Sequence, residues 1–532
     1  MTQPRLLGAI LLAAAWLRLW GIGFGLPHPM TRPDEEFLIG KALGIFSDYN
    51  PHFFEWPSLY FYVVHAVFRI VYWAGYLAGT YRDTNHFVQA SVADPAWIYL
   101  TLRLMSAIAG TATVLVVHGI CRVLFDRWTA AVAAFFLAVA YLHVRDSHFG
   151  VLDVPLTLLV AVTVRVLAAA WISPRPMVLL LCAGVVAGLA SSIKYNAAAL
   201  LAPCGVVTAL KLIEASRPER ARVLAAGIGC LLLFAAAFVL GSPYVVLDPD
   251  GFREGIGAQV TRLSGGHGIA VANVWRQQLT FSLWYGVGGP VLVASALGLA
   301  YLTWLDWRRA AIVAAFPLAY FAVIGSGYTA FIRYATPLVP FVCIFAAAVV
   351  SAAASRSGAR APAVAMATAV VLALPSTVVA VRFNRMLTEG DSRVLAGEWL
   401  ATQVAPDQTV HETGALYAHP TAAWPPGRSR MAPVGFDANT GRFSARDGAV
   451  ERPDWIVVAE SPLRLYTPVA PELRSILAAE YQRVQVFSPT REPEPEAWFD
   501  RQDAFFLPYA NFSRRERPGP QLSIYRRTAG QR

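Results

Sequence analysis

The chain has 532 residues, of which 56% are hydrophobic and only 15% are charged. Soluble globular proteins carry about 25% charged residues, so most of this surface is expected to face lipid, and a soluble enzyme is excluded. The formal net charge of +10 does not indicate nucleic-acid binding, because arginines between membrane spans are the usual mark of cytoplasmic loops.

Apolar runs long enough to cross a hydrocarbon core, about 20 residues each, recur from the N-terminus to residue 382. The first run lacks a small-residue cleavage site and many others follow it, so we interpret it as a retained anchor. The sequence predicts about eleven spans, at residues 6–22, 101–121, 128–143, 154–172, 177–193, 196–212, 222–240, 281–303, 310–325, 336–354 and 362–382.

Residues 58–80 are ambiguous, since they are long enough to cross but carry His65, Arg69 and many aromatic residues. Such a composition is typical of a helix lying at the membrane interface. If the segment does not cross, the short arginine-rich loops all fall on one face, which is typical of the cytoplasm, and the acidic loops fall on the other. We therefore predict a cytoplasmic N-terminus and a first outer loop with interfacial helices over residues 31–80.

The region after residue 382 contains no spanning run and is rich in Pro, Arg and Glu. Its patterns predict one amphipathic helix in SRVLAGEWLATQVA and short strands in WIVVAE and RVQVFS. The predicted fold class is thus an α-helical polytopic membrane protein, with a transmembrane domain over residues 1–382. A small α/β domain over residues 383–532 follows. With eleven spans and a cytoplasmic N-terminus, this domain is predicted to lie outside the cytoplasm.

The first outer loop carries two adjacent acids, Asp34 and Glu35, just after the first span. One interpretation is a helix start, with Asp34 as N-cap and an acidic first turn. The other is a general base, because a carboxylate at a partly dry membrane surface can accept a proton from a hydroxyl. The sequence leaves both open.

Three later residues are expected on the same face. Asp153 opens the next span in FGVLDVP, where it could simply cap the helix, and the nearby Asp146 and His148 could simply be solvated. Lys194 lies near the end of GLASSIKYN, where a membrane-anchoring role is the alternative, and Arg333-Tyr334 lies in IRYATPLVP. Two cations among acids favour an anionic ligand, and a phosphate-linked lipid fits them.

The ordered set of these motifs resembles the GT-C glycosyltransferases, in particular bacterial relatives of the dolichyl-phosphate-mannose protein mannosyltransferases and of the lipid A aminoarabinose transferases. The motifs are the acidic pair, Glu55-Trp56-Pro57, FGVLDVP, GLASSIKYN and IRYATPLVP. The resemblance covers residues 1–382 in order. It implies a GT-C transmembrane catalytic domain with two interfacial helices after the first span. This agrees with the distribution of basic and acidic loops between the two faces.

The resemblance also implies a chemistry, an inverting transfer of a sugar from a polyprenyl-phosphate donor to a hydroxyl of a lipid, glycan or protein. Asp34 matches the catalytic base, with Glu35 beside it, and Asp153 matches the second acid. Lys194 and Arg333, with Tyr334, match the residues that hold the donor. Glu55 aligns with an acid that helps to bind a divalent metal, and His267 is a candidate second ligand.

One departure from the aminoarabinose transferases is that Glu55 is followed by Trp instead of Lys, which argues against lipid A as the acceptor. Two other classes of function remain open. A transporter of a lipid-linked or anionic solute would place its charged residues near the middle of the spans, whereas here they lie at span ends. A structural or sensory protein would concentrate such residues in its outer domain.

Overall fold

The computed structural model describes residues 3–265, 268–424, 434–445, 448–450, 452–491 and 497–528. The chain divides into two compact units. The first comprises Met1–Trp20, Leu38–Tyr81 and Thr101–Val381, and the second comprises Gly21–Phe37, Arg82–Leu100 and Arg382–Arg532. The second unit therefore combines the C-terminal region with two segments from the start of the chain, one of which carries Asp34.

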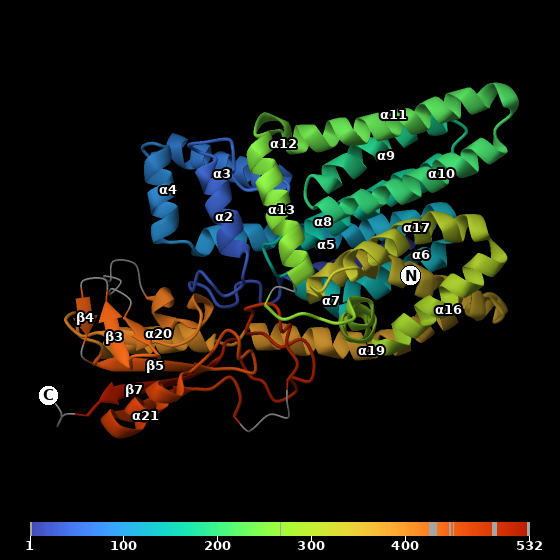
Figure 1. Cartoon of the computed structure of the whole chain (residues 1–532). Coiled ribbons are helices and arrows are strands. Elements are labelled where there is room, and N and C mark those ends of the chain that lie inside the picture. Colours follow the sequence, from blue (N-terminus) through green and yellow to red (C-terminus); the bar gives the residue numbers. More distant parts are fainter. Residues whose placement is uncertain are drawn as a thin grey trace. The chain divides into compact units, whose positions relative to one another are not determined.

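The first unit is helical throughout its described part (Figure 1). Its longer helices are α1 (Gln3–Leu19), α3 (Leu59–Leu77), α5 (Ala96–Leu124), α6 (Arg127–Val139), α8 (Asp153–Ile172), α9 (Pro176–Ser191), α10 (Leu201–Glu214), α11 (Arg217–Gly241), α13 (Pro249–Gly265), α16 (Gly289–Leu305), α17 (Trp307–Gly325), α18 (Val339–Ser355) and α19 (Ala361–Leu387). Shorter pieces join them, namely α7 (Tyr141–Asp146), α12 (Tyr244–Leu247), α14 (Val274–Gln277) and α15 (Trp284–Val287). Three helices belong partly to the second unit, because α2 (Glu35–Gly44) and α5 begin there and α19 ends there.

The predicted polytopic fold is confirmed, and every predicted span coincides with helical structure. Within the described ranges, seven helices are long and apolar enough to cross a membrane, or eight if the bent pair Val274–Val287 and Gly289–Leu305 forms one span. The remaining predicted spans correspond to shorter helices, α1, α6 and α9. Helix α3 is not among the seven, as the interfacial interpretation of residues 58–80 expects.

A buried arginine on α1 stabilises the break between α6 and α7. Arg18 donates from Nη1 to the carbonyl of Ala138 at 3.1 Å and from Nη2 to that of Leu137 at 3.2 Å. These are carbonyls that the last turn of α6 leaves without helical partners, and a cation is favoured there. Nη2 also lies 2.9 Å from His143 Nδ1 on α7. Arg18 thus ties α1 to the segment that leads to Asp153.

Small residues allow α9 and α11 to approach closely, side by side (Figure 1). A Cβ added at Gly184 would collide with the carbonyl of Cys230, and one at Gly188 with the carbonyl of Phe234. Small residues at helix interfaces are the usual way for membrane helices to pack backbone to backbone. This contact fixes the end of α9, from which the chain continues to Lys194.

The second unit contains a four-stranded sheet with the order β1 (Val410–Glu412), β5 (Trp455–Glu460), β7 (Gln521–Arg527) and β6 (Tyr481–Phe487). β1 runs parallel to β5, and the other pairs are antiparallel. A second, antiparallel sheet consists of β2 (Gly435–Asp437), β3 (Arg442–Ala445) and β4 (Gly448–Val450). The helices are α4 (Thr84–Ala93), α20 (Ser392–Gln403) and α21 (Pro471–Glu480).

The predicted elements of the C-terminal region are present, since α20, β5 and β6 cover the predicted helix and both predicted strands. β5 is an interior strand, paired with β1 and β7, and its residues Trp455–Ala459 are all buried, as the apolar run WIVVAE predicts. Ile456 and Val458 point into one cluster with Phe443, Leu473 and Leu477. The small sheet and α21 therefore share a core with the larger sheet.

Candidate active site

The first unit brings together three of the charged residues that the sequence singled out. Asp153 is the first residue of α8, and its side chain is only 3% exposed. Lys194 Nζ lies 2.6 Å from Asp153 Oδ1, and Arg333 Nε lies 4.0 Å from Asp153 Oδ2. The two cations keep 12% and 11% of their side chains exposed. We call this group the Asp153 cluster.

The residues around Lys194 fix its position from three directions. Lys194 has an extended backbone between the end of α9 and the short helix η1 (Tyr195–Leu200). The next residue, Tyr195, donates its hydroxyl to the carbonyl of Phe54 at 2.8 Å, and Asn196 donates from Nδ2 to the Tyr320 hydroxyl at 3.3 Å. Three consecutive side chains therefore bind to α8, to the segment between α2 and α3, and to α17.

Arg333 lies on the short helix η3 (Ile332–Leu338), which a buried polar network holds in place. Thr336, one turn after Arg333, donates to Asp146 Oδ2 at 2.5 Å, and Arg145 Nη1 donates to Asp146 Oδ1 at 2.7 Å. The solvated alternative for Asp146 and His148 does not hold, because Asp146 is 1% exposed and His148 is fully buried. Asp146 is buried where it accepts the hydrogen bond from Thr336, which lies 190 residues further along the chain, and no local sequence pattern reveals such a contact.

Aromatic rings flank the two cations of the Asp153 cluster. Lys194 Nζ lies 4.9 Å from the ring centre of Tyr334, and the Arg333 guanidinium lies 4.0 Å from that of Phe331. Contacts of this kind help to keep a cation in place. The cluster contains two basic side chains and one acidic side chain, a composition that suits an anionic ligand.

The second unit holds Asp34 and Glu35. Asp34 immediately precedes α2, but its φ of 78° is left-handed, whereas an N-cap residue normally has an extended backbone. Such a conformation costs a non-glycine residue about 1 kcal/mol or more, and it recurs at functional sites. The helix-start interpretation is therefore incomplete for Asp34, while Glu35 does begin α2 and is fully buried.

Glu36 is a third acid at this position, and the sequence analysis did not single it out. Its Oε1 accepts a hydrogen bond of 2.7 Å from the Tyr417 hydroxyl, and its Oε2 is buried. Burial raises the pKa of Glu36 to about 7, with a further contribution from the neighbouring charges of Asp34 and Glu35. The run of three acids was visible in the sequence, but the hydrogen bond between Glu36 and Tyr417, 381 residues later, was not.

The predicted site residues thus fall into two groups. Asp153, Lys194, Arg333 and Tyr334 belong to the first unit and are brought together there, whereas Asp34 and Glu35 belong to the second unit. That the two groups share one pocket stays a prediction.

The proposed metal ligands do not form a metal site in the described part of the chain. Glu55 pairs with Arg262 of α13, so its carboxylate already has a cationic partner. His267 lies outside the described residues. Across the described ranges, no group of three His, Cys, Asp or Glu side chains could hold a metal ion. Metal binding by Glu55 and His267 therefore stays a prediction, and no chemical step is derived through a metal.

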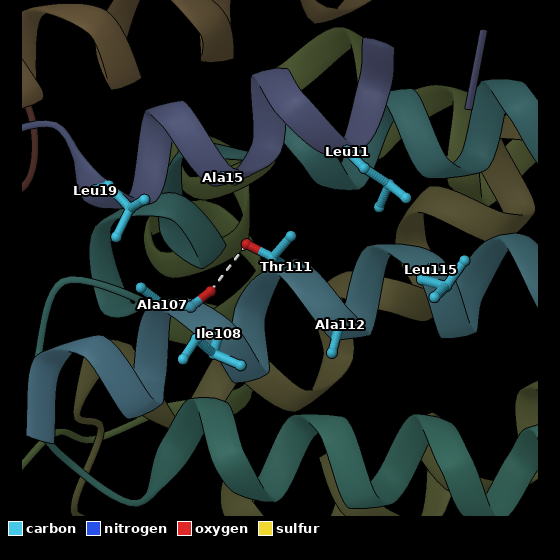
Figure 2. Close-up of a pocket in the computed structure, with 8 residues that line it drawn as sticks. All are labelled: Leu11, Ala15, Leu19, Ala107, Ile108, Thr111, Ala112 and Leu115. Atoms are coloured by element: carbon cyan, nitrogen blue, oxygen red, sulfur yellow. Dashed lines mark hydrogen bonds between the residues drawn. The ribbon is translucent and has the colours of Figure 1, made fainter. Parts of the chain in front are cut away.

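A measurable cavity of about 350 Å³ lies elsewhere, between α1 and α5 (Figure 2). Its lining is almost entirely apolar and comprises Leu11, Ala15, Leu19, Ala107, Ile108, Thr111, Ala112 and Leu115. The one hydroxyl, that of Thr111, is bonded to the Ala107 carbonyl of its own helix at 2.9 Å (Figure 2). This groove can accommodate a hydrocarbon chain but has no group for catalysis, so we place the candidate site at the charged clusters.

Comparison with known proteins gives one family match and several structural ones. Residues 99–245 match the family described as dolichyl-phosphate-mannose-protein mannosyltransferase. This segment contains the Asp153 and Lys194 motifs. A comparison with curated protein sequences finds no match.

Among solved structures, the chain is similar to ArnT from Cupriavidus metallidurans bound to undecaprenyl phosphate, with a TM-score of 0.52, 14% identity and coverage of 99% of this chain and 98% of that one. It is also similar to the oligosaccharyltransferase of Archaeoglobus fulgidus in complex with Zn and sulfate, with a TM-score of 0.51, 13% identity and coverage of 86% and 68%. For the apo form of that enzyme the TM-score is 0.51 and the identity is 14%, with coverage of 82% of this chain and 61% of that one.

Proposed function

We propose that this chain, which has the GT-C fold of membrane glycosyltransferases, transfers a sugar from a polyprenyl-phosphate donor to a hydroxyl group. The GT-C resemblance predicted from the sequence motifs is confirmed at the level of this fold. The observation that carries the proposal is the Asp153 cluster, because two cations face one nearly buried carboxylate at the ends of membrane helices. An anionic group attached to a lipid is the ligand that such a place fits best.

The donor phosphate is assigned to Lys194 and Arg333. Arg333 can contact two phosphate oxygens with its planar guanidinium, and Lys194 supplies a point charge. Asp153 holds both cations in place before the donor arrives, at 2.6 Å and 4.0 Å. As the bond between sugar and phosphate breaks, negative charge grows on the leaving phosphate, and preplaced cations lower the free energy of that transition state.

The acceptor is activated by Asp34 in this proposal. The acceptor oxygen attacks the anomeric carbon, the bond from that carbon to the phosphate oxygen breaks, and the hydroxyl proton passes to the Asp34 carboxylate. Polyprenyl phosphate leaves with the bonding electrons and stays next to Lys194 and Arg333. One displacement inverts the anomeric configuration. Tyr334, whose ring contacts Lys194, is assigned to the donor side.

Positions at span ends favour an enzyme over a transporter. Asp153 begins α8, Lys194 immediately precedes the span Tyr195–Glu214, and Arg333 is the second residue of the span Ile332–Ser355. A transporter is expected to hold its charged residues near the middle of the bilayer. The arginine-rich loops support an extracytoplasmic active site in the cytoplasmic membrane.

The test is Asp34→Asn, which keeps the size of the side chain and removes the base. Lipid extracts from cells without this chain are expected to accumulate a polyprenyl-phosphate sugar, which the wild-type protein consumes. The variant should leave it unconsumed while binding undecaprenyl phosphate normally, since general base catalysis contributes about 10²–10⁴-fold to a rate. Asp250→Asn is the matched control, because Asp250 is exposed on α13. A wild-type rate for Asp34→Asn would remove Asp34 from the role of base.

A further inference from the structure

The segment that carries Asp34 is bonded at several points to the C-terminal region. His28, Arg32 and Glu36 all have partners among residues 382–532, although more than 350 residues of sequence separate the two segments. All of these contacts lie inside the second unit. The loop over residues 28–36, which we call the acidic loop, is therefore built together with the C-terminal region.

The central contact is a buried ion pair. Arg32 Nη1 donates to Asp503 Oδ2 at 3.0 Å, and the two side chains are only 2% and 7% exposed. The Arg32 guanidinium also lies 4.8 Å from the ring centre of Phe505. A buried charge whose partner is removed is strongly unfavourable, so Asp503 determines where Arg32 can lie. Arg32 is two residues before Asp34.

A second contact holds the loop on the other side of Asp34. The Tyr417 hydroxyl donates to Glu36 Oε1 at 2.7 Å, two residues after Asp34. Tyr417 is itself held through its carbonyl, which accepts a hydrogen bond of 2.8 Å from Arg393 Nη1. Arg393 is in turn fixed by Asp391 through contacts at 2.7 and 2.9 Å. The chain of contacts is buried at Arg393 and Asp391.

The entry to the loop is fixed by His28, which is fully buried. Its Nδ1 accepts from the backbone N–H of Met30 at 3.0 Å, so the ring is neutral and its Nε2–H donates to the carbonyl of His419 at 2.9 Å. Burial, followed by the charge of Arg393, lowers the pKa of His28 to about 3, in keeping with this neutral form. The loop is therefore held before, beside and after Asp34.

Asp34 has a left-handed φ of 78° between these contacts. An isolated loop would relax such a residue, since the conformation persists only where the surroundings determine it. We propose that Asp503 and Tyr417 are positioning residues that hold Asp34, through Arg32 and Glu36, in the conformation used for catalysis. The C-terminal region is then a part of the catalytic apparatus and not only a separate outer domain. This inference rests on the proposed role of Asp34 as base.

The test uses the full chain with two substitutions that keep side-chain shape, Asp503→Asn and Tyr417→Phe. The initial rate is measured at which purified protein consumes the lipid-linked sugar extracted from deletion cells, over a range of lipid concentrations. Loss of position of a general base should lower kcat by about tenfold or more for Asp503→Asn and by several-fold for Tyr417→Phe. The KM for the lipid and the affinity for undecaprenyl phosphate should stay within about twofold, because Lys194 and Arg333 lie in the other unit.

Two controls separate positioning from stability. Glu480→Gln breaks an ion pair in the same unit, in which Arg452 Nε lies 2.6 Å from Glu480 Oε2. This variant should leave kcat at the wild-type value. Asp503→Glu keeps the charge and should recover most of the rate. If Asp503→Asn does not fold, Tyr417→Phe decides, because it removes one hydroxyl and leaves the ring.

The outcomes distinguish this inference from the proposed function. If Asp34→Asn consumes the lipid at the wild-type rate, the proposed function fails. If Asp34→Asn is inactive while Asp503→Asn and Tyr417→Phe keep the wild-type kcat, the positioning role is overturned and the base remains. A uniform fall in kcat and in undecaprenyl phosphate affinity also overturns it, since that result indicates a merely structural role.

Discussion

Lys194 and Arg333 approach one carboxylate, Asp153, from two different elements, and each is expected to bind the donor phosphate. Replacing either cation with Ala removes a charged hydrogen bond of about 1.5–3 kcal/mol. Affinity for undecaprenyl phosphate, measured by titration of the purified protein, should therefore fall about 10- to 100-fold for each variant. Lys211→Ala is the control, because Lys211 lies at the end of α10 next to Glu214. Unchanged affinity in both variants would contradict the phosphate assignment.

Glu36 predicts a pH dependence of stability. Its pKa is raised from 4.5 to about 7, mainly by burial, so the folded state prefers the protonated form. The stability that this preference contributes is fully present below pH 4.5 and is lost as the pH rises to about 7. Glu36→Gln resembles the neutral form. At pH 8 it should unfold at a higher temperature than wild type, with a free energy of unfolding larger by up to about 3 kcal/mol. At pH 4 the two proteins should unfold at the same temperature. A lower unfolding temperature for Glu36→Gln than for wild type at pH 8 would refute this prediction.

At the scale of residues, sequence reasoning identified Asp153, Lys194, Arg333 and Tyr334 because each lies in a short motif beside a span. It could not identify Asp503 or Tyr417 as partners of the acidic loop, since their contacts join residues 471 and 381 positions apart. It also missed the burial of Asp146. Partners of buried charges depend on tertiary packing, which a single sequence does not specify.

Among elements, the α9–α11 pair is expected to control the position of Lys194. Gly188→Leu would force the α9 backbone away from the Phe234 carbonyl and displace the end of the helix. Overpacking of this kind typically costs about 1–3 kcal/mol, so the unfolding temperature and the affinity for undecaprenyl phosphate should both fall. Gly205→Leu is the control, because a Cβ at Gly205 meets nothing within 4 Å. Equal behaviour of the two variants would show that the close approach is not needed.

The helices themselves were largely predictable, because an apolar run of sufficient length has few alternatives in a membrane. The lengths of the helices were less predictable. α6 ends at Val139, where Arg18 caps its carbonyls. The run over residues 281–303 contains a bend of 113° next to Gly288. Gly288 has a φ of 84°, which permits this bend. These breaks depend on side chains and backbone conformations that hydropathy averages over.

At the scale of the whole molecule, the sequence predicted two domains that meet at residue 382, and the structure has a unit boundary at Val381/Arg382. The inclusion of Gly21–Phe37 and Arg82–Leu100 in the C-terminal unit was not foreseen. A change in composition marks where spans end, but it cannot show that an early loop packs with a late domain. The proposed reaction therefore requires Asp34 and the Asp153 cluster to meet at one face of the membrane.

The most direct test of this claim is cysteine labelling from one side of the membrane. In a Cys182→Ser background, single cysteines replace Asp48 in the predicted first outer loop, Tyr328 beside the Arg333 segment and Arg308 in a basic loop, all of which are exposed. In intact spheroplasts, Asp48→Cys and Tyr328→Cys should react with a membrane-impermeant maleimide, and Arg308→Cys should react only after permeabilisation. Labelling of positions 48 and 328 from opposite compartments would contradict a shared active site.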